Sequence, residues 1–136
     1  KIDNYGKYKI PQEMTVIDFV VTNKKIVGLG VDKTVKIWDI DSYNVLKTIS
    51  MTEYGRFTCM AVSKNDDFLL CGTAEGYVLG FDAKKIGIDT IMILKQRIVK
   101  IEIRSMSWFH YSGEDQSKRF LIMTAEGSVK LFSFFF

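Results

Sequence analysis

One stretch of this sequence occurs three times, and this repetition constrains the fold more than any other feature. Residues 31–39 read Val-Asp-Lys-Thr-Val-Lys-Ile-Trp-Asp, a polar turn followed by an alternating segment that ends in Trp-Asp. Residues 74–82 and 125–133 follow the same plan, with a phenylalanine where the first copy has Trp38. The equivalent aromatic positions are 43 and 51 residues apart. A period near 40–50 residues is typical of arrays built from one repeated structural unit.

The stretch that ends at Asp39 resembles the end of a WD repeat, the four-stranded blade unit of a β-propeller. The resemblance implies an all-β fold, a WD-type β-propeller segment of about three four-stranded antiparallel blades that form part of a larger ring. The composition agrees, because β-branched and aromatic residues are frequent and turns recur every 8–12 residues. We therefore expect strands throughout and no sustained helix.

The resemblance is clear in the second half of each repeat and weaker elsewhere. A WD repeat holds its blade with a hydrogen-bonded set of Trp, a Ser or Thr, the His of a Gly-His pair, and a turn Asp. This chain has no Gly-His pair, and the hydroxyl position holds Gly28, Cys71 and Ile122. The acid of the turn is kept as Asp32, Glu75 and Glu126. We expect blades that depend on apolar packing more than on polar networks.

The repeats place blade 1 at about residues 14–50, blade 2 at about 55–95 and blade 3 at about 99–136. Residues 1–12 are a candidate outer strand of a neighbouring or closing blade. From the innermost strand outward, the expected strands are 16–21, 25–30, 34–39 and 45–49 in blade 1, and 57–62, 68–73, 77–82 and 91–94 in blade 2. Those of blade 3 are 103–109, 120–124 and 128–132, and the longer interval before it is attributed to an insertion at 111–119.

Three blades are too few to close a propeller, which typically has four to eight. The two end blades would each leave an apolar face in water, and such faces are association surfaces. Two arrangements would cover them: further blades from the same parent chain, which we favour, or an oligomer partner that closes the ring. The start of the chain at Lys1, without an initiator methionine, also favours a piece of a longer chain.

Charge and cysteine content limit the kind of partner and compartment. The 19 basic and 16 acidic residues give a net charge of +3, and the basic residues are scattered rather than clustered. Direct nucleic-acid binding, which needs a concentrated basic patch, is therefore not expected. No stretch approaches the roughly 18 apolar residues of a membrane span. Cys59 and Cys71 are expected in two different strands of the same blade, where a disulfide between neighbouring strands is one alternative, but we favour free thiols in an intracellular, cytoplasmic protein.

The sequence offers little for catalysis. His110 is the one histidine, so a Ser-His-Asp or Cys-His arrangement must use it, and a zinc site has too few ligands. The sequence also lacks a glycine-rich phosphate loop. We therefore expect no enzymatic activity, no cofactor and no metal.

Partner binding remains, and the resemblance places it on one rim. In WD propellers this rim is formed by the turns between the second and third strands and the loops that lead into each innermost strand, and it usually binds peptides. Tyr and Arg are frequent interface anchors. The candidate partner-binding residues are Glu53, Tyr54, Arg56, Arg97, Asp32, Lys33, Glu75 and Glu126.

Two functions are compatible with these features. The first is a non-catalytic protein–protein interaction scaffold within an intracellular multiprotein complex. The alternative is an accessory or regulatory propeller module of a larger enzyme or motor protein, whose activity lies outside this segment. The sequence on either side of residues 1–136 would distinguish them.

Overall fold

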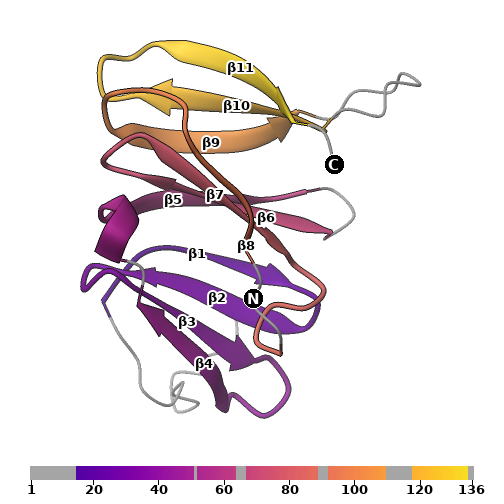
Figure 1. Ribbon diagram of the computed structural model, residues 1–136. Coiled ribbons are helices and arrows are strands. Elements are labelled where there is room, and N and C mark those ends of the chain that lie inside the picture. Colours follow the sequence, from indigo (N-terminus) through magenta and orange to yellow (C-terminus); the bar gives the residue numbers. More distant parts are fainter. Residues whose placement is uncertain (1–14, 51, 64–66, 89–91, 110–117, 135–136) are drawn as a thin grey trace, which may run out of the picture.

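The computed structural model shows three antiparallel sheets stacked one on the next (Figure 1). It describes residues 15–50, 52–63, 67–88, 92–109 and 118–134. The expected all-β propeller-like fold is confirmed. Two of the sheets have four strands and the third has three within the described residues. We refer to these sheets as blades 1, 2 and 3 in chain order.

Blade 1 is a four-stranded meander in which each strand pairs with the next. It contains β1 (Val16–Thr22), β2 (Lys25–Gly30), β3 (Thr34–Asp39) and β4 (Val45–Ser50). A two-residue turn joins β1 to β2, and Asn23 and Lys24 both have positive φ, as a tight hairpin turn of this kind requires. The strands lie where the alternation of the sequence predicts them.

Blade 2 repeats the meander after one turn of 3₁₀ helix, η1 (Thr52–Tyr54). Its strands are β5 (Phe57–Val62), β6 (Phe68–Thr73), β7 (Tyr77–Asp82) and β8 (Met92–Arg97). The expected outer strand at 91–94 was too short, because β8 continues through Gln96 and Arg97, which pair with Val78 and Tyr77. A polar outer strand lacks the apolar alternation that marks a strand in a sequence, so its end was placed too early.

Blade 3 contains β9 (Ile103–Phe109), β10 (Lys118–Thr124) and β11 (Val129–Phe134), with β10 in the middle. The expected start of its second strand at residue 120 was two residues late, since Lys118 and Arg119 pair with Phe134 and Ser133. The greater part of the expected insertion at 111–119 lies outside the described residues, as do His110 and the candidate strand at 1–12.

The three blades share a backbone irregularity that the sequence did not indicate. In each innermost strand, one residue after the first is left out of the pairing with the second strand, which is the mark of a β-bulge. The skipped residues are Ile17, Thr58 and Arg104. This shared bulge aligns Val16, Phe57 and Ile103 as equivalent positions, and it makes the internal repeat visible in the backbone.

Two hydrophobic cores lie between the blades. The first joins blades 1 and 2 and includes Val27, Phe57 and Cys71, while the second joins blades 2 and 3 and includes Cys59 and Ile103. Cys59 and Cys71 are therefore on opposite faces of blade 2, and both are free thiols. Side chains on opposite faces of a sheet point away from each other, so the two sulfur atoms do not meet. The expectation of free thiols is confirmed.

Candidate partner-binding rim

The turn between the second and third strands of each blade is tied to the residue that precedes the innermost strand. The backbone N–H of Val31 donates to the Thr15 oxygen at 3.1 Å, and the N–H of Ala74 donates to the Arg56 oxygen at 2.9 Å. In blade 3, Ala125 donates to the Glu102 oxygen at 3.0 Å. The same contact in all three blades brings the turns and the incoming loops to one end of the sheets, which we call the rim.

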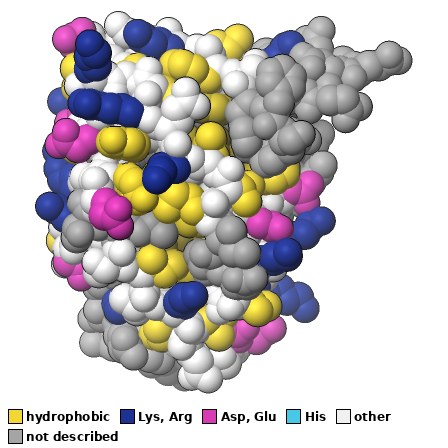
Figure 2. Space-filling model, in the orientation of Figure 1, with side chains coloured by type: hydrophobic (Ala, Val, Ile, Leu, Met, Phe, Trp, Pro, Cys, Tyr) yellow, Lys and Arg dark blue, Asp and Glu magenta, His cyan; other side chains and the backbone are white. Residues whose placement is uncertain are grey.

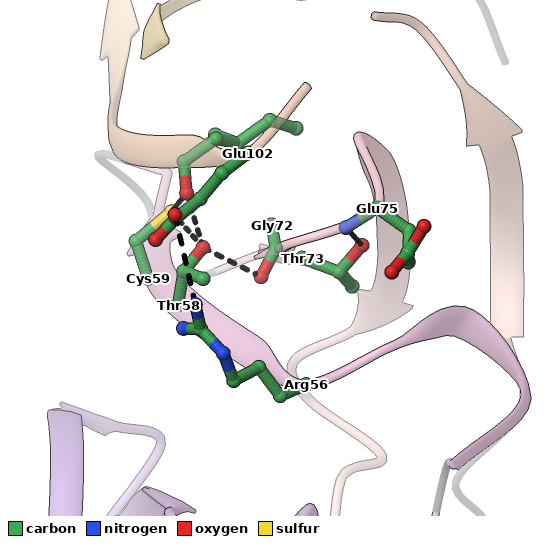
Figure 3. Close-up of polar contacts among 8 residues, drawn as sticks. Arg56, Thr58, Cys59, Gly72, Thr73, Glu75 and Glu102 are labelled. Carbon is green, nitrogen blue, oxygen red and sulfur yellow. Dashed lines mark hydrogen bonds and ion pairs between the residues drawn. The ribbon is translucent and has the colours of Figure 1, made fainter. Parts of the chain in front are cut away.

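An ion pair crosses the boundary between blades 2 and 3 on this rim. Arg56 precedes β5 and Glu102 precedes β9, and their guanidinium and carboxylate groups are 3.6 Å apart (Figure 3). Below the pair, the Thr58 hydroxyl lies within hydrogen-bonding reach of the Ile103 carbonyl and of the Gly72 carbonyl, the latter at 3.2 Å. The bulge at Thr58 turns this side chain toward the neighbouring blade, so blades 2 and 3 are joined at the rim by polar contacts.

The turn of blade 2 is held by the strand that precedes it. The Thr73 hydroxyl accepts hydrogen bonds from the backbone N–H of Glu75 at 3.3 Å and of Tyr77 at 3.1 Å. The carbonyl oxygen of Gly76 accepts the N–H of Ile98 at 3.0 Å. A hydroxyl that satisfies turn amides is a common device for fixing a tight turn. The turn and the loop into blade 3 therefore form one fixed unit.

Arg97 lies at the end of β8 and not in the loop where the sequence placed it. Its Nε donates to the carbonyl oxygen of Glu75 at 2.8 Å, while the side chains of both residues are exposed. This contact joins the outermost strand of blade 2 to the rim. The rim of blade 2 thus presents an arginine whose orientation is fixed by a backbone contact.

Aromatic rings and a lysine form a layer beside these residues. The rings of Tyr54 and Tyr77 have centroids 5.6 Å apart, and the Lys95 ammonium lies 5.6 Å from the Tyr54 ring centroid. Such contacts stabilise side chains in a partly exposed setting by about 0.5–1.5 kcal/mol. In Figure 2, charged side chains are frequent along the left border of the molecule, and hydrophobic side chains are more frequent in the middle of the face, with some charged side chains among them.

The turn between the second and third strands of blade 1 is held by hydrogen bonds within the turn itself. The Asp32 carboxylate accepts hydrogen bonds from the Thr34 hydroxyl at 2.6 Å and the Thr34 N–H at 3.1 Å, and these contacts lower the pKa of Asp32 below its usual value. Lys33 has a φ of 65°. Asp32 therefore shapes the turn, and the exposed Lys33 is its outward-facing residue.

The structure brings together part of the set expected from the sequence. Tyr54, Arg56, Glu75 and Arg97 lie on the rim of blade 2 and at its boundary with blade 3. The remaining candidates are distributed over other parts of the rim, with Glu53 in η1, Asp32 and Lys33 in the turn of blade 1, and Glu126 in the turn of blade 3.

Three residues of the rim were missed in the sequence: Glu102, Tyr77 and Lys95. A signal for Glu102 was present, because it holds the same place before its innermost strand as Arg56 and carries the opposite charge. Tyr77 and Lys95 gave no such signal, since their contacts with Tyr54 depend on how η1 packs against β7 and β8.

A small pocket lies between blades 2 and 3, away from the inner strands. Its volume is about 180 Å³, below the roughly 300–1,000 Å³ of sites for drug-sized ligands. The lining residues are Val78, Leu94, Gln96, Arg97, Ile98, Phe120, Phe132 and Ser133.

The described residues hold no group of three or more His, Cys, Asp or Glu side chains that could bind a metal ion. Burial raises the pKa of the Cys59 thiol to about 11 and also raises the pKa of the Cys71 thiol. Both thiols are neutral near pH 7, which is unfavourable for a nucleophile. In the part of the chain that the structure describes, no apolar helix reaches membrane-spanning length.

The stacked antiparallel sheets and their repeated bulge define the fold of the chain as a β-propeller segment, and similar solved structures show that it is of the WD type. Two similar solved structures carry the titles "Structure of U3-55K" and "Crystal structure of RRP9 WD40 repeats". Their TM-scores are 0.65 and 0.64, each at 15% sequence identity over 92% of this chain. The chain spans 40% of the length of each of these proteins. No family model and no curated protein sequence matches it.

Proposed function

We propose that this chain is a non-catalytic interaction scaffold that binds protein partners on its rim within an intracellular, cytoplasmic complex. The observation that carries the proposal is the group formed by Tyr54, Arg56 and Arg97, which are held in place by Tyr77, Glu102 and the Glu75 carbonyl. Arginine and tyrosine are enriched among the residues that dominate binding energy. Side chains that are already oriented lose less conformational entropy when a partner binds.

The charge of the group indicates the kind of partner. The Arg56 side chain is 50% exposed although it is paired with Glu102, so its remaining N–H groups can reach a ligand. Arg97 uses its Nε for Glu75 and is likewise exposed. A guanidinium group favours planar acceptors such as carboxylates. A peptide with an acidic side chain next to an aromatic or aliphatic one would fit this part of the rim.

One further feature supports a scaffold inside the cell. Free, buried cysteines are usual in proteins of reducing compartments. The fold itself is a platform on which unrelated functions are built, so the rim residues and not the fold carry the proposal.

The test compares the proteins that co-purify with the tagged chain and with its Tyr54→Ala/Arg56→Ala variant. We expect the variant to lose partners that the unchanged chain retains. The matched control is Lys84→Ala/Lys85→Ala, which removes two exposed lysines from the turn after β7, at the opposite end of the blade. The control should retain all partners, and circular dichroism should show both variants folded. Unchanged binding by the Tyr54→Ala/Arg56→Ala variant would refute the rim proposal.

A further inference from the structure

The outermost strand of blade 2 has an open edge. Within the described residues, β8 lies at the end of its sheet and pairs with β7 alone. A strand in this position leaves the backbone N–H and C=O groups of alternate residues without a strand partner. Blade 2 shares one core with blade 1 and the other with blade 3, so the open edge of β8 belongs to neither end of the stack.

Two basic side chains lie on one face of this strand. Lys95 and Arg97 pair with Leu79 and Tyr77 of β7, which both contact the core shared with blade 1. Since residues directly opposite each other in paired strands share a face, both basic side chains lie on the blade 1 side of β8. Both are exposed, and neither forms an ion pair with a carboxylate of the described residues.

The two basic side chains are held in place by neutral groups. The Arg97 Nε donates to the carbonyl oxygen of Glu75 at 2.8 Å, and the Lys95 ammonium lies 5.6 Å from the centroid of the Tyr54 ring. Each contact uses only part of the donor capacity of its cation. The remaining N–H groups can therefore reach a carboxylate beside β8, and their fixed positions reduce the entropy lost on binding.

The other face of β8 is uncharged. Leu94 packs in the core shared with blade 3, and Gln96 pairs with Val78 of the same core. The strand thus alternates between a neutral and a basic residue over its last four positions. The equivalent outer strand of blade 1, β4, has Lys47 as its single charged residue. The basic stripe is therefore a property of blade 2 and not of the repeat.

We infer that β8 accepts an acidic, extended segment of a partner protein as an additional strand. Hydrogen bonds between the two backbones would supply affinity, as in other cases of strand addition. Acidic side chains at alternate positions of the partner would lie on the face of Lys95 and Arg97, with uncharged side chains between them. Opposite charges across paired strands stabilise and like charges destabilise, so a basic segment would be rejected.

The same charges disfavour a second copy of this chain as the occupant. Two β8 edges joined in one antiparallel sheet would bring the Lys95 and Arg97 side chains of both copies to the same face. The inference goes beyond the rim proposal, because it concerns the outer edge of blade 2 and has only Arg97 in common with the rim group.

The experiment measures the binding of two labelled peptides to the chain by fluorescence anisotropy at low ionic strength. Each peptide has six residues, the length of β8, and alternates valine with glutamate (the acidic peptide) or with lysine (the basic peptide). We expect the unchanged chain to bind the acidic peptide and not the basic one. Lys95→Glu/Arg97→Glu should bind the acidic peptide about tenfold more weakly and should bind the basic peptide instead. A folded variant, judged by circular dichroism, that gains no affinity for the basic peptide would overturn the inference.

A second measurement uses the unchanged chain and tests the backbone contact directly. The acidic peptide is prepared in two further forms, N-methylated on its valines or on its glutamates. In an extended strand the N–H groups of alternate residues point to the same edge, so only one form blocks the groups that face β8. That form should bind about tenfold more weakly, because its hydrogen bonds to β8 are lost. The other form should bind nearly as well as the unmodified peptide, and equal effects of the two methylations would refute strand addition.

A charge-matched control separates the β8 site from general attraction between opposite charges. Lys47→Glu/Lys85→Glu makes the same change in net charge at two exposed residues outside β8. This variant should bind the acidic peptide as the unchanged chain does. If it lost as much affinity as Lys95→Glu/Arg97→Glu, the peptide would be bound by net charge alone and the inference would be wrong.

Two further controls separate the β8 edge from the rim and from a second copy. Arg56→Ala should retain the acidic peptide whatever its effect on rim partners, and loss of the peptide would place it on the rim and not on β8. Light scattering without peptide should give the unchanged chain and Lys95→Glu/Arg97→Glu the same molar mass. A larger mass for the unchanged chain alone would assign the edge to a second copy and overturn the inference.

Discussion

The indole N–H of Trp108 donates a hydrogen bond to the carbonyl oxygen of Ala61, 3.2 Å away, across the boundary between blades 2 and 3. Trp108 lies on β9 and is 8% exposed, and its ring contacts those of Phe68 and Phe120. Ala61 lies on β5, the innermost strand of the preceding blade. The contact therefore combines apolar packing with a hydrogen bond to a buried carbonyl group.

Trp108→Phe keeps an aromatic ring but removes the donor. Leaving a buried acceptor without its partner costs about 1–3 kcal/mol. We expect the free energy of unfolding, measured with urea, to fall by about that amount while the far-ultraviolet circular dichroism stays unchanged. A loss below about 0.5 kcal/mol would show that the hydrogen bond to Ala61 contributes little.

Thr73 and Thr124 occupy the same place in blades 2 and 3 but differ in their contacts. The Thr73 hydroxyl accepts hydrogen bonds from two backbone N–H groups of the turn, whereas the buried Thr124 hydroxyl has no hydrogen-bond partner among the described residues. Thr73→Val should destabilise the chain by about 1–3 kcal/mol, because it leaves the amides of Glu75 and Tyr77 unpaired. Thr124→Val should be neutral or stabilising. Urea unfolding of both variants would test this, and equal losses would contradict it.

Gly76 and Gly127 form a second matched pair, with φ values of 87° and 83° in equivalent turns. A Cβ atom on Gly76 would lie 1.9 Å from the carbonyl oxygen of Val99, but one on Gly127 would meet nothing within 4 Å. Gly127→Ala should therefore cost only the backbone strain, about 1–2 kcal/mol. Gly76→Ala should cost clearly more, because the loop into blade 3 must move. Thermal unfolding would compare them, and a smaller loss for Gly76→Ala would be inconsistent with this packing.

The buried thiols give a pH dependence with a defined sign. Burial raises the pKa of Cys59 from the usual 9.0 to about 11, and the pKa of Cys71 is raised as well. The unfolded chain loses these protons near pH 9 while the folded chain keeps them. Their contribution to the free energy of unfolding is therefore fully present below pH 9 and is lost as the pH rises from 9 toward 11.

Urea unfolding at pH 8 and pH 10 would measure this effect against a Cys59→Ala/Cys71→Ala variant, which lacks both thiols. We expect the unchanged chain to lose more stability between the two pH values than the variant does. An equal loss in the two proteins would mean that the thiols do not contribute. Native Cys59 and Cys71 should also react with a thiol reagent only slowly at pH 8 and rapidly in urea.

Much of the fold could be predicted from the sequence because its signals are local. Alternation over 57–62 and the continuous apolar run over 68–73 mark strands directly, and the repeated turn fixes where they meet. The outer strand β8 and the start of β10 were placed less well. Both contain polar or charged residues, and pairing with a neighbouring strand, not the residue pattern, decides where such strands begin and end.

The sequence alone determined the repeat, the class of fold and the residues that could lie on the rim. Only the tertiary structure showed that Arg56 pairs with Glu102, that Trp108 reaches Ala61, and that Val129 is open where Val35 is covered. The reason is physical. A strand's pattern of apolar residues is set within a few residues, but the partner that covers it comes from a segment some 40 residues away, and its position depends on how whole blades pack.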